Sequence, residues 1–303
     1  MKAEQENTIE EIQEIGEQQI SHETTLFAEP IYHFKNFTIT NALFTSWGAV
    51  LILVIVAFVL RSKLREIPKG IQNFFEMIID GALSFCDQVT NDRKLSMRIL
   101  PIAISVFLFI LVNNWLGLLP LGGFGLLEAG EEGGLAFVPI FRGGTADINT
   151  TLGLAIMAVI GANLFGAFSI GFWKTFNKYV NLKAIGQIPG KIKKDPTIIL
   201  VSPITFLVGL FEIIGEFAKM ASLSFRLFGN VFAGEVLLAS IAALIAYIVP
   251  IPFMFLEIFV GAIQAFIFAI LLTVYFTIGA SDHDEEHEEH KEAHEENKKV
   301  LPA

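Results

Sequence analysis

An arginine inside a long apolar stretch is the first residue of this chain that indicates chemistry. It is Arg226, in the segment Ser222-Leu223-Ser224-Phe225-Arg226-Leu227-Phe228-Gly229-Asn230. A guanidinium stays protonated at any ordinary pH, and holding it at membrane depth costs roughly 2.5 kcal/mol or more. Such an arginine can act as a counter-ion, a relay element or an electrostatic barrier, whereas one near a helix end can simply extend to the lipid headgroups. The polar residues around Arg226 favour a functional role.

Those polar residues recur at helical spacing. Because a helix advances by about 100° per residue, Glu212, Lys219 and Arg226, which are seven residues apart, share one face. Asn230 lies one turn beyond Arg226, close to that face, whereas Glu235 falls on the opposite side. Each residue alone could be a buried polar group with a local partner. Their recurrence within one apolar segment indicates a shared task.

A second apolar helix supplies polar residues at matching depths. Glu257 and Gln264 are seven residues apart and share a face of that helix. The Pro250–Pro252 segment marks a turn between the two helices, which can therefore run antiparallel. We expect Glu235 to lie at about the depth of Glu257 across this hairpin. We likewise expect Arg226 to lie at about the depth of Gln264.

The composition is that of a membrane protein with several spans. Of 303 residues, 53% are hydrophobic and 17% are charged, whereas a soluble domain usually has about 25% charged residues. We predict an all-α polytopic membrane protein with about five membrane-embedded helices, at residues 43–60, 99–119, 148–172, 198–248 and 253–278. The fourth stretch is more than twice the ~20 residues that span a bilayer. We therefore expect one long helix, tilted or lying in the membrane, with Pro203 as the place where it could break. With the last helix it would form a long, tilted C-terminal hairpin.

The charges between these spans predict the orientation. Basic residues crowd the segments 61–69, 93–98 and 174–194, which places those ends in the cytoplasm and the N-terminus outside. Residues 68–89 repeat apolar positions at helical spacing but contain Asp80 and Asp87, so we predict an amphipathic helix at the cytoplasmic interface.

Composition also predicts the division of the chain. The glycine-rich residues 121–146 are expected to form an outer loop. The predicted parts are an acidic extracytoplasmic segment at 1–41, a membrane domain at 42–280 and an acidic, His-rich cytoplasmic tail at 281–303.

Several motifs resemble those of one family. They are Arg226-Leu227-Phe228-Gly229-Asn230, Ala233-Gly234-Glu235, Gln264-Ala265-Phe266-Ile267-Phe268, Asn114-Trp115-Leu116-Gly117-Leu118-Leu119-Pro120 and Thr145-Ala146-Asp147-Ile148-Asn149. With them the chain resembles subunit a of the bacterial F-type ATP synthase, from about Ile31 to Asp282. The resemblance implies an outer N-terminus, a tilted membrane hairpin and an inner C-terminus, in agreement with the topology above. It also implies the bacterial plasma (inner) membrane.

The resemblance implies a role for each polar residue. Arg226 takes the place of the stator arginine that faces the rotating ring of c subunits, with Gln264 as its neighbour across the hairpin. Glu235 and Glu257 belong to an outer half-channel, and Glu212 to an inner one. The remaining residues expected to serve proton translocation are Asn230, Lys219, Asn114 and Asp147.

The carboxylates of the outer half-channel depart from the family's pattern. Many members have a histidine and a glutamate at the two positions that Glu235 and Glu257 occupy here, which argues against a neutral-imidazole relay. Two carboxyls at matched depth in a weakly hydrated channel cannot both ionise cheaply. We therefore expect the pair to share a proton.

These expectations describe a non-catalytic, proton-conducting subunit. The chain has no G-x-x-x-x-G-K-[ST] phosphate loop, so ATP chemistry would belong to partner subunits. The expected partners are the c-ring, the peripheral-stalk b subunits, the remainder of the ATP synthase complex and the lipid membrane. The alternative is a self-contained secondary transporter in which Arg226 binds an anionic substrate. Transporters often contain repeated halves, and this sequence has no internal repeat.

No cofactor, metal or nucleic acid is expected. Four tail histidines have a spacing that could bind a metal if the tail were helical; they are His283, His287, His290 and His294. The density of acidic residues around them favours a solvated tail instead. The basic loops are explained by membrane topology rather than by nucleic-acid binding.

Overall fold

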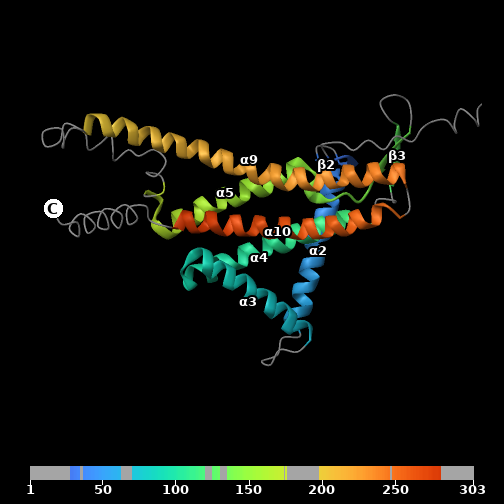
Figure 1. Ribbon diagram of the computed structural model, residues 1–303, viewed down its shortest axis with the longest axis horizontal. Coiled ribbons are helices and arrows are strands. Elements are labelled where there is room, and N and C mark those ends of the chain that lie inside the picture. Colours follow the sequence, from blue (N-terminus) through green and yellow to red (C-terminus); the bar gives the residue numbers. More distant parts are fainter. Residues whose placement is uncertain are drawn as a thin grey trace, which may run out of the picture. The chain divides into compact units, whose positions relative to one another are not determined.

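The chain folds as an all-α polytopic membrane protein, as predicted. The computed structural model describes residues 28–34, 37–62, 70–119, 125–129, 135–173, 175, 198–245 and 248–280. Within these residues, five helices are long and apolar enough to cross a membrane (Figure 1). They are α2 (Asn41–Ser62), α4 (Arg93–Leu118), α5 (Ile148–Ile170), α9 (Ile198–Leu244) and α10 (Pro250–Ala280). The predicted boundaries of the terminal segments are not tested, because residues 1–27 and 281–303 lie outside the described residues.

The predicted amphipathic helix is α3 (Ile71–Thr90). Its residues Leu83 and Cys86 are buried, whereas Ile71, Phe74 and Met77 are exposed. Burial raises the pKa of the Cys86 thiol. The separation of buried and exposed apolar positions fits a helix that packs on one side and meets lipid on the other.

The long apolar stretch after residue 198 is a single helix of 47 residues, α9, and the break considered at Pro203 does not occur. At 1.5 Å per residue it is roughly 70 Å long, more than twice the ~30 Å hydrocarbon thickness, so it cannot stand upright in a bilayer. The predicted turn at Pro250–Pro252 is wrong by a few residues, because both prolines open α10. Proline suits the first turn of a helix, where its missing N–H costs no hydrogen bond.

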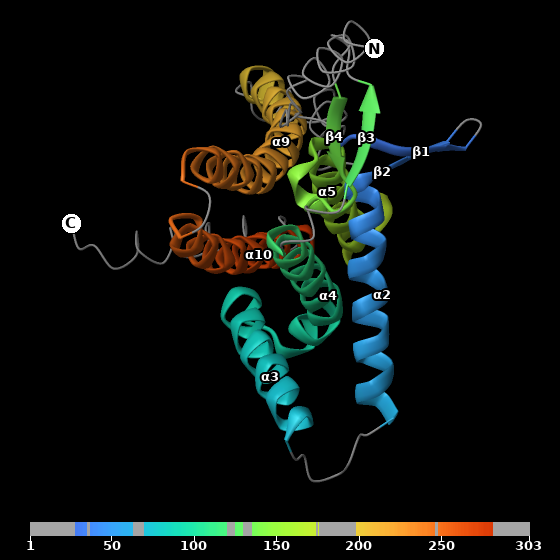
Figure 2. The ribbon, with the colours of Figure 1, turned by 90° about the vertical axis from the view of Figure 1, so that its right-hand side faces the viewer.

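Two short hairpins were not predicted. Strands β1 (Pro30–Phe34) and β2 (Phe37–Thr40) pair antiparallel before α2. Strands β3 (Gly125–Ala129) and β4 (Leu135–Pro139) pair antiparallel in the segment predicted as an outer loop (Figure 2). A short 3-10 helix, η2 (Gly144–Ala146), follows β4, and its three residues are buried.

The chain forms two compact units, each built from three separate segments. Unit 1 comprises residues 1–77, 104–153 and 223–268, and unit 2 comprises 78–103, 154–222 and 269–303. Within unit 2, α5 and α10 approach so closely that a Cβ on Gly166 would lie 2.2 Å from the carbonyl oxygen of Gly279. Small residues at such crossings are typical of membrane helices, whose backbones must approach closely to pack.

Candidate functional site

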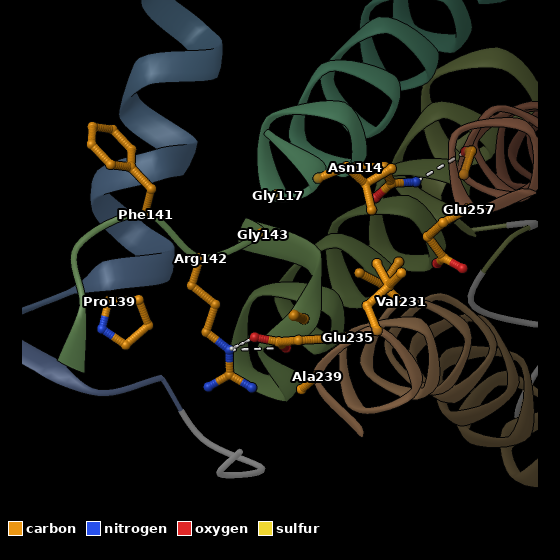
Figure 3. A pocket seen from close by; sticks show the side chains of 14 residues that line it. Asn114, Gly117, Pro139, Phe141, Arg142, Gly143, Val231, Glu235, Ala239 and Glu257 are labelled. Atoms are coloured by element: carbon orange, nitrogen blue, oxygen red, sulfur yellow. Dashed lines mark hydrogen bonds and ion pairs between the residues drawn. The ribbon is translucent and has the colours of Figure 1, made fainter. Parts of the chain in front are cut away.

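Unit 1 contains a pocket of about 180 Å³ between four parts of the chain (Figure 3). Those parts are the end of α4, residues 139–146, the second half of α9 and the first half of α10. Its lining residues are Asn114, Gly117, Leu118, Pro139, Phe141, Arg142, Gly143, Ala146, Val231, Glu235, Leu238, Ala239, Glu257 and Gly261. Since a water molecule occupies about 30 Å³ in the liquid, the pocket is large enough for a short chain of waters.

An ion pair crosses this pocket. Arg142 Nε donates to Glu235 Oε2 at 3.2 Å and lies 3.1 Å from Glu235 Oε1 in the same ion pair. In Figure 3 the two side chains point toward one another. The Arg142 side chain is only 3% exposed, and that of Glu235 is 29% exposed. A buried guanidinium cannot lose its charge, so this carboxylate is its natural counter-ion.

Arg142 was not among the predicted site residues. It lies in an irregular segment with no helical periodicity, and its partner is 93 residues away in sequence. The signal that could have found it is local: an arginine stands beside the Gly143–Gly144 pair and just before the motif at Asp147.

The two glycines explain how this arginine is held. A Cβ on Gly117 would lie 2.7 Å from the Cα of Gly143, so α4 and the segment after β4 touch backbone to backbone. A Cβ on Gly144 would lie 2.2 Å from Ser46 Oγ and 2.4 Å from Asn113 Oδ1. The segment is therefore wedged between α2 and α4, which fixes the backbone that carries Arg142.

Glu257 enters the same pocket from α10. Its carboxylate lies directly on the backbone of Gly234, where an added Cβ would come within 2.2–2.5 Å of the carboxyl atoms. The structure thus brings Glu235 and Glu257 to one pocket, although Glu235 is 15 residues before Pro250 and Glu257 only 5 after Pro252.

Asn114 joins three elements next to the pocket. It is 3% exposed. Its Nδ2 donates to the carbonyl oxygen of Gly261 at 3.0 Å, and its Oδ1 accepts from Thr145 Oγ1 at 2.5 Å. On the next residue, Trp115 Nε1 donates to the carbonyl oxygen of Ile258 at 3.2 Å. These bonds tie α4 to α10 and to η2, so Asn114 holds the pocket walls together.

Asp147 is also buried, but it serves the start of α5. Its Oδ2 accepts from the backbone N–H and the hydroxyl of Thr150, at 3.2 Å and 3.1 Å. Its Oδ1 accepts from the backbone N–H of Ala28 at 3.3 Å. This is the geometry of a helix N-cap. Asp147 is not among the described residues that line the pocket, and its predicted part in proton translocation stays a prediction.

Arg226 lies on an exposed side of α9. The preceding Ser224 is buried and shares a hydrogen bond of 3.2 Å with Thr151 Oγ1 on α5. Leu223 and Leu227 are buried as well, and Phe225 is 61% exposed. Leu223, Ser224 and Leu227 therefore mark the packed side of α9. The Arg226 side chain lies on the exposed side of the helix, which is called the open side below.

The other two predicted neighbours of Arg226 are inside unit 1. Gln264 is 7% exposed on α10. Asn230 is partly buried, and among the described residues its Nδ2 has no hydrogen-bond partner. A buried donor of this kind usually bonds to water. Contact of Arg226 with Gln264 across the hairpin stays a prediction.

Unit 2 holds a separate polar cluster. Lys219 Nζ donates to Glu216 Oε1 at 2.8 Å, and Asn163 Nδ2 donates to Glu216 Oε2 at 3.4 Å. The ammonium of Lys219 also lies over the ring of Tyr275, 5.5 Å from its centroid. Glu216 was not among the predicted site residues, although it is the partner of Lys219. Glu212 was among the predicted site residues, and it is half-buried on the same helix.

A metal site finds no support in the part of the chain that the structure describes. There, no group of three or more His, Cys, Asp or Glu side chains could hold a metal ion. The four tail histidines considered above lie outside the described residues.

Comparisons with known proteins agree on one family. The model of the family described as "ATP synthase A chain" matches residues 43–277. The chain is 34% identical to ATP synthase subunit a of Syntrophobacter fumaroxidans over 251 residues, covering 82% of this chain and 88% of that protein. It is 33% identical to the subunit a of Gloeobacter violaceus, with 82% and 86% coverage. For Mycobacterium ulcerans the identity is 35%, with 82% and 89% coverage.

Proposed function

The chain belongs to the ATP synthase A chain family, and we propose that it is the proton-translocating stator subunit of a bacterial F-type ATP synthase. In this proposal it catalyses no reaction itself. It works against a ring of c subunits, is held by the peripheral-stalk b subunits and the rest of the complex, and lies in the bacterial inner membrane. Its N-terminus is outside and its C-terminus is in the cytoplasm, as the basic loops predict.

The exposure of Arg226 is the observation that carries the proposal. A guanidinium on the open side of a membrane helix is costly against lipid. The cost falls if the open side meets a partner that brings a carboxylate into the membrane. A ring of subunits with one carboxyl each is such a partner, and the motif around Arg226 occupies the family's stator position.

The mechanism follows from charge. A ring carboxyl is tolerable in lipid when protonated and costly when ionised. Beside Arg226 the ionised form is favoured, because an opposite charge stabilises it. The proton therefore leaves into one aqueous half-channel as the carboxyl reaches Arg226, and the empty carboxylate reloads from the other. The fixed charge of Arg226 also repels protons that would leak directly between the two paths.

Two polar regions supply the proposed half-channels. The pocket with Glu235 and Glu257 is the outer one, because it adjoins the segment at 139–146 that follows the predicted outer loop. The cluster of Glu216 and Lys219, with Glu212 on the same helix, belongs to the inner one. Each elementary charge moved through 100 mV is worth about 2.3 kcal/mol, so several protons must pass for each ATP. A rotating ring can accumulate them.

Substitution of Arg226 tests the proposal. In the whole complex in sealed inverted membrane vesicles, we expect Arg226→Ala to abolish ATP-driven acidification while the complex still assembles. Arg226→Lys should rescue poorly, because an ammonium is a compact point charge without the planar fork of a guanidinium. The matched control is Arg98→Gln, which removes an exposed arginine of α4 and should pump normally. Normal coupled pumping by Arg226→Ala would overturn the proposal.

A further inference from the structure

We infer that Asn41 is a positioning residue for the pocket of unit 1, and that with Ala28 and Glu29 it holds the pocket wall at both ends. The wall is the segment of residues 139–146, five of which line the pocket. Ala28 and Glu29 form a strap across it. The inference rests on the proposed function, in which this pocket is the outer half-channel. The strap and Asn41 precede residue 43, where the match to the family model begins.

Asn41 is fully buried in the first turn of α2, although its amide is polar. A polar residue at the start of a helix usually caps it, but here Thr40 supplies the cap. Its Oγ1 accepts a hydrogen bond from the backbone N–H of Leu43 at 3.3 Å. Because a buried amide is costly unless it is hydrogen-bonded, the partners of Asn41 indicate what this residue holds in place.

The side-chain amide of Asn41 bonds to three segments. Its Nδ2 donates to the carbonyl oxygen of Pro139 at 3.2 Å and to Glu29 Oε2 at 3.5 Å. Its Oδ1 accepts from the backbone N–H of Ala42 at 2.8 Å and from that of Glu29 at 3.2 Å. A carboxamide offers two donors and two acceptor positions, and here each has a partner. Asn41 therefore joins the end of β4 to the strap and to α2.

The strap also holds the other end of the wall. The backbone N–H of Ala28 donates at 3.3 Å to Oδ1 of Asp147, the residue directly after the wall. Since Ala28 and Glu29 are neighbours, one short segment is bonded to the start of α5 and, through Asn41, to the end of β4. The wall is thus held at both of its ends, and Arg142 lies between them.

Packing against α2 supports the middle of the wall. The ring centroids of Phe141 and Phe44 are 5.6 Å apart. Figure 3 shows Phe141 beside α2 and Arg142 pointing into the pocket toward Glu235. Apolar contacts are not directional, so the hydrogen bonds at the two ends fix where the wall lies. Loss of the Asn41 bonds should let the wall shift, which would move the Arg142–Glu235 pair and open the pocket to water.

The test is the accessibility of a pocket cysteine in the whole assembled complex. Leu238→Cys, on the α9 side of the pocket, is introduced into a Cys86→Ser background, because Cys86 is the only cysteine of the chain. Adding Asn41→Ala should make a small water-soluble methanethiosulfonate label position 238 about tenfold faster, since losing buried hydrogen bonds shifts a local opening equilibrium by roughly that factor. The matched control, Thr40→Ala, removes the cap of the same helix and should leave the labelling rate unchanged.

Two further measurements separate positioning from folding. A cysteine in place of Ile110, which is fully buried in α4 of the same unit, should stay unlabelled in every variant. General loosening of unit 1 would expose it as well. In chains with the native Leu238, ATP-driven pumping per assembled complex should fall about tenfold in Asn41→Ala, because small displacements of positioned groups have effects of at least this size. Pumping by Thr40→Ala should stay near that of the wild type.

Faster labelling together with slower pumping in Asn41→Ala would support the inference. Equal labelling of Asn41→Ala and Thr40→Ala, labelling at position 110, or faster labelling with normal pumping would overturn it. If Asn41→Ala does not assemble, Asn41→Ser takes its place, because the shorter side chain keeps a hydroxyl but does not reach Pro139. If that variant also fails to assemble, Asn41 serves folding and the inference fails. Failure of the proposed function looks different: it appears as normal pumping by Arg226→Ala, whereas the labelling needs no proton transport.

Discussion

The pocket of unit 1 and the polar cluster of unit 2 each contain an ion pair, but the two pairs are built in different ways. Arg142 and Glu235 are 93 residues apart and meet only through the fold, with the arginine almost fully buried. Glu216 and Lys219 are three residues apart on one helix, and the lysine side chain is 31% exposed. The first pair fixes charge at one place. The second is a local pair whose lysine can still reach water.

The two ion pairs are also expected to differ in how much free energy is lost when one partner is removed. Removing one partner of a buried pair typically costs about 3–5 kcal/mol, because the other charge is left without compensation. A helical pair at i,i+3 contributes only about 0.2–0.5 kcal/mol. The pocket of unit 1 is therefore expected to be sensitive to single substitutions, whereas the cluster of unit 2 should tolerate them.

The largest expected effect comes from a crowded glycine of unit 2, so for this kind of substitution unit 2 is the more sensitive unit. We expect Gly166→Ala to prevent assembly or to lower the amount of assembled complex severely. A Cβ there meets the carbonyl oxygen of Gly279 at 2.2 Å and its carbonyl carbon at 2.8 Å, and backbone atoms cannot move aside without separating α5 from α10. Gly153→Ala on the same helix is the matched control, since nothing lies within 4 Å of its Cβ position. Equal assembly of both variants would show that the close crossing in unit 2 is wrong.

Replacing a glycine of unit 1 that faces mainly side chains should have a milder effect. In Gly144→Ala the new methyl group meets Ser46 Oγ and Asn113 Oδ1, which can rotate away, and the backbone oxygen of Ala42 at 3.3 Å. The complex should assemble, but the displaced segment carries Arg142, so ATP-driven pumping should fall by roughly tenfold, equivalent to about 1.4 kcal/mol. Pumping rate per assembled complex is the measurement. An unchanged rate would mean that the wedge does not position Arg142.

The two carboxylates in the ion pairs provide the direct comparison. We expect Glu235→Gln to reduce pumping strongly, because it removes the carboxylate that pairs with the buried Arg142 guanidinium in the pocket. Glu216→Gln should reduce pumping by less than about threefold, since the exposed part of Lys219 can be solvated. Initial rates of acidification in vesicles distinguish them. If Glu216→Gln is the more damaging change, unit 2 holds the more demanding site and the comparison is reversed.

The smallest effect concerns Cys86 on α3. Its thiol is buried and its pKa is raised by burial, so little thiolate forms near pH 7. A maleimide should therefore label Cys86 slowly, and labelling should accelerate only at a pH above the ordinary range for a thiol. The comparison is Met77→Cys in a Cys86→Ser background, because Met77 is 62% exposed on the same helix. Equal rates at every pH would show that α3 does not pack through Cys86.

Periodicity and hydrophobicity predicted most of the fold, because both are local properties. The five long helices and α3 begin and end within several residues of their predicted bounds. That Glu235 and Glu257 would lie near one another was expected from an antiparallel hairpin, although a residue count from the two prolines does not give it. These features depend on residues that lie close together in the sequence.

Contacts between distant segments could not be predicted in the same way. Arg142 has no periodic neighbours, and only the folded chain brings it to Glu235. Lys219 was assigned to the face of Arg226 by its spacing of seven, yet its partner is Glu216, three residues earlier. Asp147 matched a motif, and the structure shows it capping α5. Spacing indicates which residues share a helix face, but it does not say which neighbour satisfies each charge.

The central claim is that the open side of α9 at Arg226 faces a partner with a carboxyl in the membrane. Photo-crosslinking from Phe225 tests it most directly, because that side chain is 61% exposed beside Arg226. A benzophenone amino acid at position 225 of the assembled complex should form an adduct with the ring-forming subunit. The same group in place of Phe228, which is 8% exposed, should react mainly within the chain. Adducts of position 225 with lipid alone, or with no ring subunit, would contradict the account.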